Sequence, residues 1–221
     1  MEPLIYSRMV ATHGGMNQWF LMYLWRPLLY GILLGVLAGC ERSSTPLNHP
    51  WAADVTGAGQ MASFRMTDMY GHLRSATDWR GKVLLLFFGY THCPEVCPTT
   101  LYTLAQTMRQ LGPAADNVQV VFVTLDPQRD TAAVLRQFVP SFDHRFLGLY
   151  GSVPATQALE KTYGVYVQRH DTSVAGDYTL DHSAFIYAFD RHGRLRLKMP
   201  YGETSMQMAS DIRQLQVSGS R

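Results

Sequence analysis

Charged side chains are scarce in this sequence: Asp, Glu, Lys and Arg make up 16% of its 221 residues, against about 25% in an average soluble protein. The 19 Lys and Arg nearly balance the 17 Asp and Glu, which leaves a formal net charge of +2. Proteins that bind nucleic acid through bulk charge need a densely basic face, so this composition argues against that class. Hydrophobic residues reach 47%, enough for a core of ordinary size, and this excludes a chain that is disordered throughout.

Cysteine is also rare, with three residues at positions 40, 93 and 97. Three cysteines are too few for a small domain stapled by disulfides. The chain has no internal repeat, and the only Gly-x-Gly run, residues 57–59, does not follow a strand pattern, so no phosphate-binding loop is indicated. The separation of Cys40 from the other two cysteines predicts two unrelated roles.

Long apolar runs are lacking too. The longest, Leu28 to Ala38, is shorter than the roughly 20 residues of a membrane-spanning helix, but it suits the apolar part of a signal peptide and follows Arg26. It closes on Leu37-Ala38-Gly39-Cys40, which resembles the lipobox of bacterial lipoproteins, so Cys40 is the predicted site of lipidation. An uncleaved anchor helix over residues 19–39 is the alternative. Both hypotheses place the rest of the chain outside the cytoplasm, anchored to a bacterial membrane.

Three regions follow from this pattern. Residues 1–40 are predicted to be a signal peptide, with Met16 as an alternative start. Residues 41–60 are polar and rich in Pro, Gly and Ser, as expected of a flexible tether. Residues 61–221 are predicted to form one globular domain.

The globular part alternates strand-like and helix-like segments. Two continuous apolar runs, residues 82–88 and 118–125, are typical of strands buried on both faces. A short strand is expected over 146–149, and a hairpin over 183–189 and 195–199. Helices are expected over 99–111, 131–139, 153–163 and 204–217. This order predicts an α/β sandwich with a mixed sheet.

Cys93 and Cys97 lie where the first buried strand passes into the first helix. At the amino terminus of a helix the macrodipole favours thiolate over thiol. A spacing of four places both sulfurs on one side of a helical turn, close enough for a disulfide or a shared metal ion. Two thiolates leave most metals under-coordinated, so a third ligand is expected from elsewhere in the fold. Sulfur donors with one imidazole would select Cu(I) or Zn(II).

The residues around this dithiol resemble the Sco/SenC family of copper-binding, thioredoxin-fold proteins that serve cytochrome c oxidase assembly. The resemblance rests on GKVLLLFFGYTHCPEVCPTTL (81–101), VQVVFVTLDPQRDT (118–131), FLGLYGS (146–152), YGVYV (163–167), DYTLDHSAFIYAFD (177–190) and the terminal PYG (200–202). The C-x-x-x-C-P element together with D-H-S before a strand is specific, whereas either one alone is weak.

The resemblance implies a thioredoxin-like three-layer sandwich with a central mixed sheet. It also implies copper as the cofactor, Cu(I) or Cu(II), held by Cys93, Cys97 and His182. The two cysteines would also form a redox disulfide, and Asp126 would influence the site as a nearby carboxylate. The implied function is a membrane-tethered copper metallochaperone, not an enzyme, whose partners are the copper-bearing subunit of cytochrome c oxidase or other copper chaperones.

Two hypotheses stay open beside it. Cys93 and Cys97 could serve a periplasmic thiol-disulfide oxidoreductase acting on cysteines of a partner protein. Such enzymes usually carry C-x-x-C and a proline before the facing strand, where this chain has His182, and this argues for coordination. A purely structural disulfide is the third hypothesis. His92, adjacent to Cys93, is expected to point away from the site.

Overall fold

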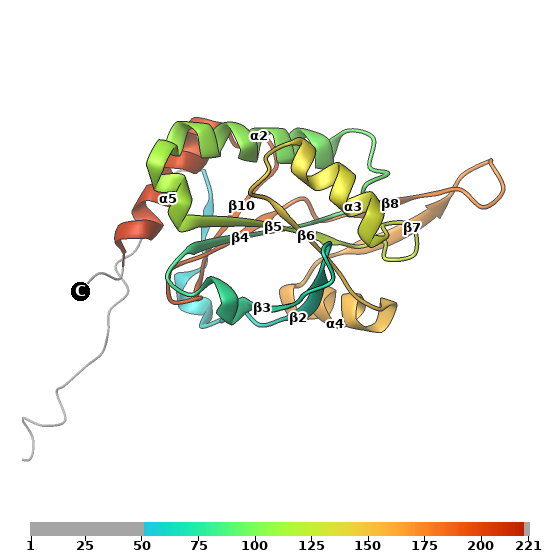
Figure 1. Ribbon diagram of the computed structural model, residues 1–221, viewed down its shortest axis with the longest axis horizontal. Coiled ribbons are helices and arrows are strands. Elements are labelled where there is room, and N and C mark those ends of the chain that lie inside the picture. Colours follow the sequence, from blue (N-terminus) through green and yellow to red (C-terminus); the bar gives the residue numbers. More distant parts are fainter. Residues whose placement is uncertain (1–50, 219–221) are drawn as a thin grey trace, which may run out of the picture. The chain divides into compact units, whose positions relative to one another are not determined.

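A mixed eight-stranded β-sheet organises residues 51–218, the part of the chain that the computed structural model describes (Figure 1). Its strands are β1 (Ala53–Asp54), β2 (Arg65–Asp68), β3 (Leu73–Ser75), β4 (Val83–Gly89), β5 (Val118–Thr124), β6 (Leu147–Tyr150), β9 (Ile186–Phe189) and β10 (Leu195–Met199). They lie in the order β1-β10-β9-β4-β5-β6-β2-β3. The pairs β4–β5 and β5–β6 are parallel and the other pairs antiparallel, so the predicted mixed sheet is confirmed.

Helices cover both faces of this sheet. They are α2 (Val96–Leu111), α3 (Ala132–Phe138), α4 (Val153–Tyr163) and α5 (Ser205–Val217), with short 3-10 helices η1 (Thr56–Ala58), η2 (Ala76–Trp79), η3 (Gly112–Asn117) and η4 (Val139–Ser141). Figure 1 shows α2, α3 and α5 on one face and α4 on the other. The result is the three-layer α/β sandwich expected from the alternating strand and helix pattern.

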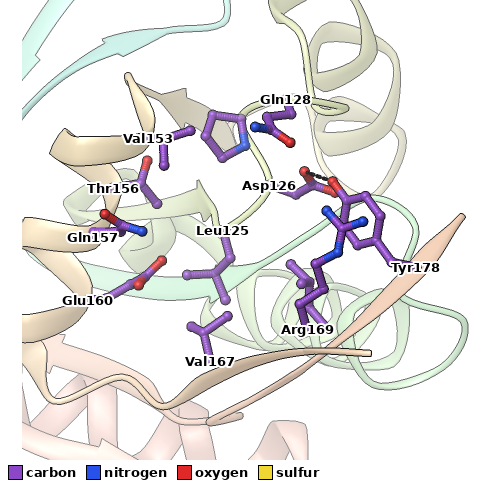
Figure 2. Close-up of a pocket in the computed structure, with 12 residues that line it drawn as sticks. Leu125, Asp126, Gln128, Val153, Thr156, Gln157, Glu160, Val167, Arg169 and Tyr178 are labelled. Carbon is purple, nitrogen blue, oxygen red and sulfur yellow. Dashed lines mark hydrogen bonds between the residues drawn. The ribbon is translucent and has the colours of Figure 1, made fainter. Parts of the chain in front are cut away.

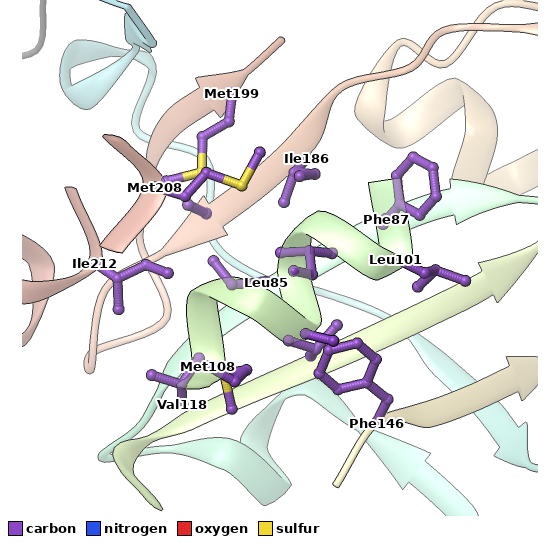
Figure 3. Packing of buried hydrophobic residues seen from close by; sticks show 14 of the residues in the cluster. Leu85, Phe87, Leu101, Met108, Val118, Phe146, Ile186, Met199, Met208 and Ile212 are labelled. Carbon is purple, nitrogen blue, oxygen red and sulfur yellow. The ribbon is translucent and has the colours of Figure 1, made fainter. Parts of the chain in front are cut away.

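The all-apolar sequence of β4 explains the two cores. Successive side chains of a strand point to opposite faces, and Leu85 and Phe87 belong to the cluster under α2 and α5, shown in Figure 3. Leu86 and Phe88 belong to the cluster under α4. Burying each such side chain contributes about 1.5–3 kcal/mol, so β4 stabilises both layers at once.

A second, two-stranded sheet is formed by β7 (Val167–Asp171) and β8 (Tyr178–His182), which pair antiparallel. The sequence analysis did not predict this hairpin, because its residues are mostly polar and β7 is largely exposed. His182 therefore ends β8, and three residues separate it from β9, instead of standing directly before the next strand.

The ordered fold starts earlier than residue 61. Ala53 and Asp54 pair with Lys198 and Leu197 of β10, so the sheet includes two residues of the segment assigned to the tether. The predicted signal peptide and the lipidation site Cys40 lie outside the described residues. None of the helices between residues 51 and 218 combines the length and the apolar character needed to cross a membrane.

Candidate metal centre

The two cysteines are placed by the junction between β4 and α2. β4 ends at Gly89, a six-residue loop follows, and α2 begins at Val96, three residues before the predicted start. Cys97 thus lies in the first helical turn, where Pro98 is tolerated because the amide groups of that turn have no helical acceptor. Cys93 lies in the loop, and its sulfur accepts a hydrogen bond from the Cys97 backbone N–H at 3.4 Å.

His182 reaches the dithiol from β8, far away in the sequence. Its Nε2 lies 3.4 Å from the Cys97 sulfur. Its Nδ1 lies 3.0 Å from the carbonyl oxygen of Ser183. A carbonyl only accepts hydrogen bonds, so Nδ1 carries the proton and Nε2 presents its lone pair to the sulfurs.

One atom from each of Cys93, Cys97 and His182 lies within 4.8 Å of the others, and within residues 51–218 this is the one set of three such side chains. A groove of about 460 Å³ opens beside it, lined by Cys93, Glu95 and Asp181 among others. The three residues singled out from the sequence are therefore adjacent in space. Two sulfurs and one imidazole nitrogen at this separation can surround a single soft metal ion.

The two thiols differ in exposure and in acidity. Cys93 is partly exposed, whereas Cys97 is fully buried. The Cys97 thiol donates to the Cys93 sulfur and lowers the pKa of Cys93 to about 4, although burial acts in the opposite direction. The same contact, reinforced by burial, raises the pKa of Cys97. The metal-free pair thus holds one thiolate, Cys93, and one thiol, Cys97.

Asp126 is not part of the three-residue set. It follows β5, accepts a hydrogen bond from the Tyr178 hydroxyl at 2.7 Å and pairs with Arg129. Its contact with the site is indirect, through the strand that carries His182. His92 is exposed, and its Nδ1 lies 3.2 Å from the Thr91 hydroxyl oxygen and 3.9 Å from Asp130, so it lies outside the set, as expected.

Asp130 is a residue whose role the sequence did not indicate. It does not cap α3, whose amino-terminal cap is Thr131. The buried Asp130 carboxylate instead accepts hydrogen bonds from the backbone N–H of Thr91, at 3.0 Å, and from the Thr124 hydroxyl, at 2.6 Å. It therefore ties the cysteine loop to the end of β5. Burial raises its pKa. The feature of the sequence that could have drawn attention to Asp130 is its spacing of four residues from Asp126.

Comparison with known proteins agrees with this arrangement. Residues 54–216 match the model of the family described as SCO1/SenC. The chain belongs to the SCO1/SenC family. Its thioredoxin-like α/β fold, predicted from the resemblance, is confirmed by solved Sco structures.

Several relatives can be named. The mitochondrial SCO2 homolog of Bos taurus is 40% identical over 132 residues, which cover 59% of this chain and 50% of the relative. This SCO1/SenC chain thus spans half the length of that relative. Bradyrhizobium japonicum ScoI with copper bound is 37% identical, with a TM-score of 0.65 over 70% of this chain and 98% of that one. Yeast Sco1 with copper bound is 28% identical, with a TM-score of 0.64 over 71% and 87%.

Proposed function

We propose that this protein binds one copper ion through Cys93, Cys97 and His182. The observation that carries the proposal is the convergence of two sulfurs and one imidazole nitrogen within 4.8 Å. Sulfur and imidazole donors favour Cu(I) over hard cations. Copper-bound structures of two family members support the choice of this metal.

The state of the donors suits metal binding. Cys93 is already a thiolate at neutral pH because its pKa lies at about 4. Because His182 Nδ1 donates its hydrogen to the Ser183 carbonyl, the lone pair of Nε2 is available to coordinate a metal ion. Coordination by Cys97 requires loss of its proton, so metal binding releases a proton from this thiol.

We further propose that the bound copper is cargo, delivered to the dinuclear copper centre of cytochrome c oxidase. The membership of the chain in the SCO1/SenC family supports this role. It makes the protein a binding and transfer protein whose partners are the copper-bearing oxidase subunit or another copper chaperone. No substrate turnover is required.

The site of action in this proposal is the outer side of a bacterial membrane, with lipid on Cys40 as the anchor. Several acyl chains hold a protein stably where one is marginal. Cys40→Ser should leave the signal segment attached, and mass spectrometry of the purified full chain tests this. A mature amino terminus elsewhere, or an unmodified Cys40 thiol, would contradict the lipoprotein hypothesis.

One observation favours a second function, thiol-disulfide exchange. A partly exposed thiolate beside a buried thiol is the arrangement of an attacking and a resolving cysteine. In this alternative the Cys93 thiolate attacks a disulfide of a partner protein and forms a mixed disulfide with it. Cys97 then loses its proton and attacks the Cys93 sulfur, so that the Cys93–Cys97 disulfide forms and the reduced partner leaves. In that reaction bonds form and break at sulfur atoms alone, whereas the copper proposal requires His182 as a ligand.

The deciding experiment is an anaerobic Cu(I) titration of the reduced protein in competition with a chelator. Wild type should bind one copper, Cys93→Ser and Cys97→Ser should lose high-affinity binding, and His182→Ala should retain a weaker two-sulfur site. His92→Ala is the matched control, since this exposed imidazole adjoins Cys93 but lies outside the set, and it should bind like wild type. Equal Cu(I) affinity of His182→Ala and wild type would rule out the three-ligand site. Equal disulfide-reductase activity of these two proteins would then favour the exchange function.

A further inference from the structure

Strand β8 carries His182 but takes no part in the main sheet. Its strand partner is β7, and together they form the separate hairpin that extends from the body in Figure 1. Ladder hydrogen bonds to the central strands therefore do not fix β8. Other contacts must determine where the imidazole lies relative to the dithiol.

The edge of β8 that faces the body is held by two side chains. The backbone N–H of Leu180 donates to the Tyr90 hydroxyl at 3.2 Å, in a buried hydrogen bond. The backbone carbonyl of Tyr178 accepts from Arg129 Nη1 at 2.9 Å. These two groups occupy the positions where a neighbouring strand would otherwise pair, and they satisfy backbone groups that would be costly to leave without partners.

Both side chains originate at the same end of the central sheet as the cysteines. Tyr90 directly follows β4, and Arg129 lies in the loop after β5. β4 and β5 are parallel neighbours, so their carboxyl ends meet at one edge. The dithiol loop and the two contacts to β8 therefore share one rigid base.

Arg129 is itself fixed in orientation. Its Nε pairs with Asp126, and its guanidinium lies 3.5 Å from the centroid of the Tyr178 ring. The hydroxyl of that ring donates to Asp126, the contact drawn as a dashed line in Figure 2. A planar guanidinium can make these contacts together, whereas a lysine ammonium offers neither the fork nor the stacking face.

Tyr90 also touches the imidazole directly. The rings of Tyr90 and His182 meet edge to face, with centroids 6.0 Å apart. One side chain thus binds the backbone of β8 two residues before His182 and packs against the His182 ring as well.

We infer that Arg129 and Tyr90 are positioning residues that hold β8, and with it the His182 imidazole, in register with Cys93 and Cys97. The inference rests on the proposed copper site, because it assigns the two residues a role in completing that ligand set. It extends the site from three ligands to the contacts that deliver the third ligand.

The first test uses the metal-free protein. Tyr90→Phe keeps the ring and removes only the hydroxyl that accepts the hydrogen bond from the Leu180 backbone N–H. Arg129→Lys keeps the positive charge but removes the planar guanidinium with its several N–H donors. Amide hydrogen exchange at Leu180 should accelerate in Tyr90→Phe, and NMR relaxation should report greater mobility of the His182 ring in both variants. A role confined to stability would lower the melting temperature without changing the mobility of this ring.

Two control variants match these changes. Arg169→Lys removes a second guanidinium that lies against the Tyr178 ring, 3.7 Å from its centroid (Figure 2). Arg169 bonds to the Asp171 carboxylate and not to the β8 backbone. Tyr102→Phe removes a hydroxyl from an exposed tyrosine of α2. Both controls should keep the His182 ring as ordered as in wild type.

The second test is Cu(I) affinity, measured against a competing chelator. Tyr90→Phe and Arg129→Lys should each weaken binding by about tenfold, the lower end of the effect seen when groups that orient metal ligands are removed, and both controls should bind like wild type. Unchanged ring mobility, or higher mobility with unchanged Cu(I) affinity, overturns the inference. If wild type does not bind Cu(I), the proposed function fails, and the mobility of the His182 ring in the metal-free variants alone decides whether the two residues position it.

Discussion

Gly89 shows how closely the dithiol packs against the sheet. A Cβ atom added at this position would lie 2.7 Å from the Cys97 sulfur and 2.9 Å from Cε2 of Phe122. Both distances are below van der Waals contact, so the last residue of β4 must lack a side chain for Cys97 to fit beneath it.

Gly89→Ala should therefore destabilise the protein by about 1–3 kcal/mol, the usual effect of overpacking a core, and it should weaken metal binding by displacing the Cys97 sulfur. Chemical denaturation and Cu(I) titration measure the two effects. Gly57→Ala is the matched control, because its added Cβ would meet no atom within 4 Å. Equal free energies of unfolding for the two variants would contradict this account.

At the residue scale, the sequence predicted which side chains meet but not how they differ. Cys93, Cys97 and His182 followed from a specific motif pair and from the resemblance it supports. The unequal acidity of the thiols depends on the full burial of Cys97 and on its contact with Cys93. The Thr91–Asp130 hydrogen bonds likewise join residues 39 positions apart, which no local pattern encodes.

At the element scale, the success of prediction followed burial. The apolar runs of β4 and β5 and the periodicity of α2 and α4 predicted the bounds of these elements to within a few residues of those in the structure. The hairpin β7–β8 was missed because β7 is polar and largely exposed, and β8 carries only a short alternation in which Tyr178 and Leu180 are buried against the core. The site is built partly on this hairpin, so the sequence predicted His182 while misplacing the strand that carries it.

The turn between β10 and α5 contains a second unusual group, Glu203. Its side chain is buried, and burial together with the Asp211 carboxylate raises its pKa to about 8. The folded protein thus keeps a proton on Glu203 up to about pH 8, whereas the unfolded chain loses it near the ordinary glutamate value of about 4.3. Between these two values the folded state binds more protons, so the free energy of unfolding falls as the pH rises.

Glu203→Gln should remove this dependence. At pH 5 the variant should unfold close to the wild-type temperature, and at pH 9 it should be the more stable protein, by about 3 °C or more in Tm for each kcal/mol regained. Thermal unfolding from pH 5 to 9 measures the difference. Asp116→Asn, at an exposed carboxylate in η3, should leave the pH profile unchanged. A parallel shift of Glu203→Gln and wild type across this pH range would show that the carboxyl is not protonated in the fold.

At the scale of the whole molecule, the candidate site joins segments that are 85 residues apart, Cys97 on α2 and His182 on β8. A ligand that binds only the folded arrangement stabilises it in proportion to its concentration and affinity. Copper bound by all three residues would therefore stabilise the contact between the hairpin and the central sheet. A disulfide between Cys93 and Cys97 would close only a short loop and would leave His182 out.

Copper and the disulfide should consequently exclude each other and affect the fold differently. When an added oxidant such as diamide joins the two sulfurs, the thiols lose two protons and two electrons, and the lone pairs needed for thiolate coordination are no longer available. Cu(I) should raise the Tm of the reduced protein but not of the oxidised protein, and bound Cu(I) should protect both thiols from alkylation. In reduced His182→Ala the rise in Tm should shrink, because the remaining two-sulfur site no longer ties β8 to α2. The measurements are anaerobic thermal unfolding with and without Cu(I), with the disulfide verified by mass. An equal rise in Tm for the oxidised protein would mean that copper binds elsewhere, and the redox state of the compartment would then have no control over copper loading.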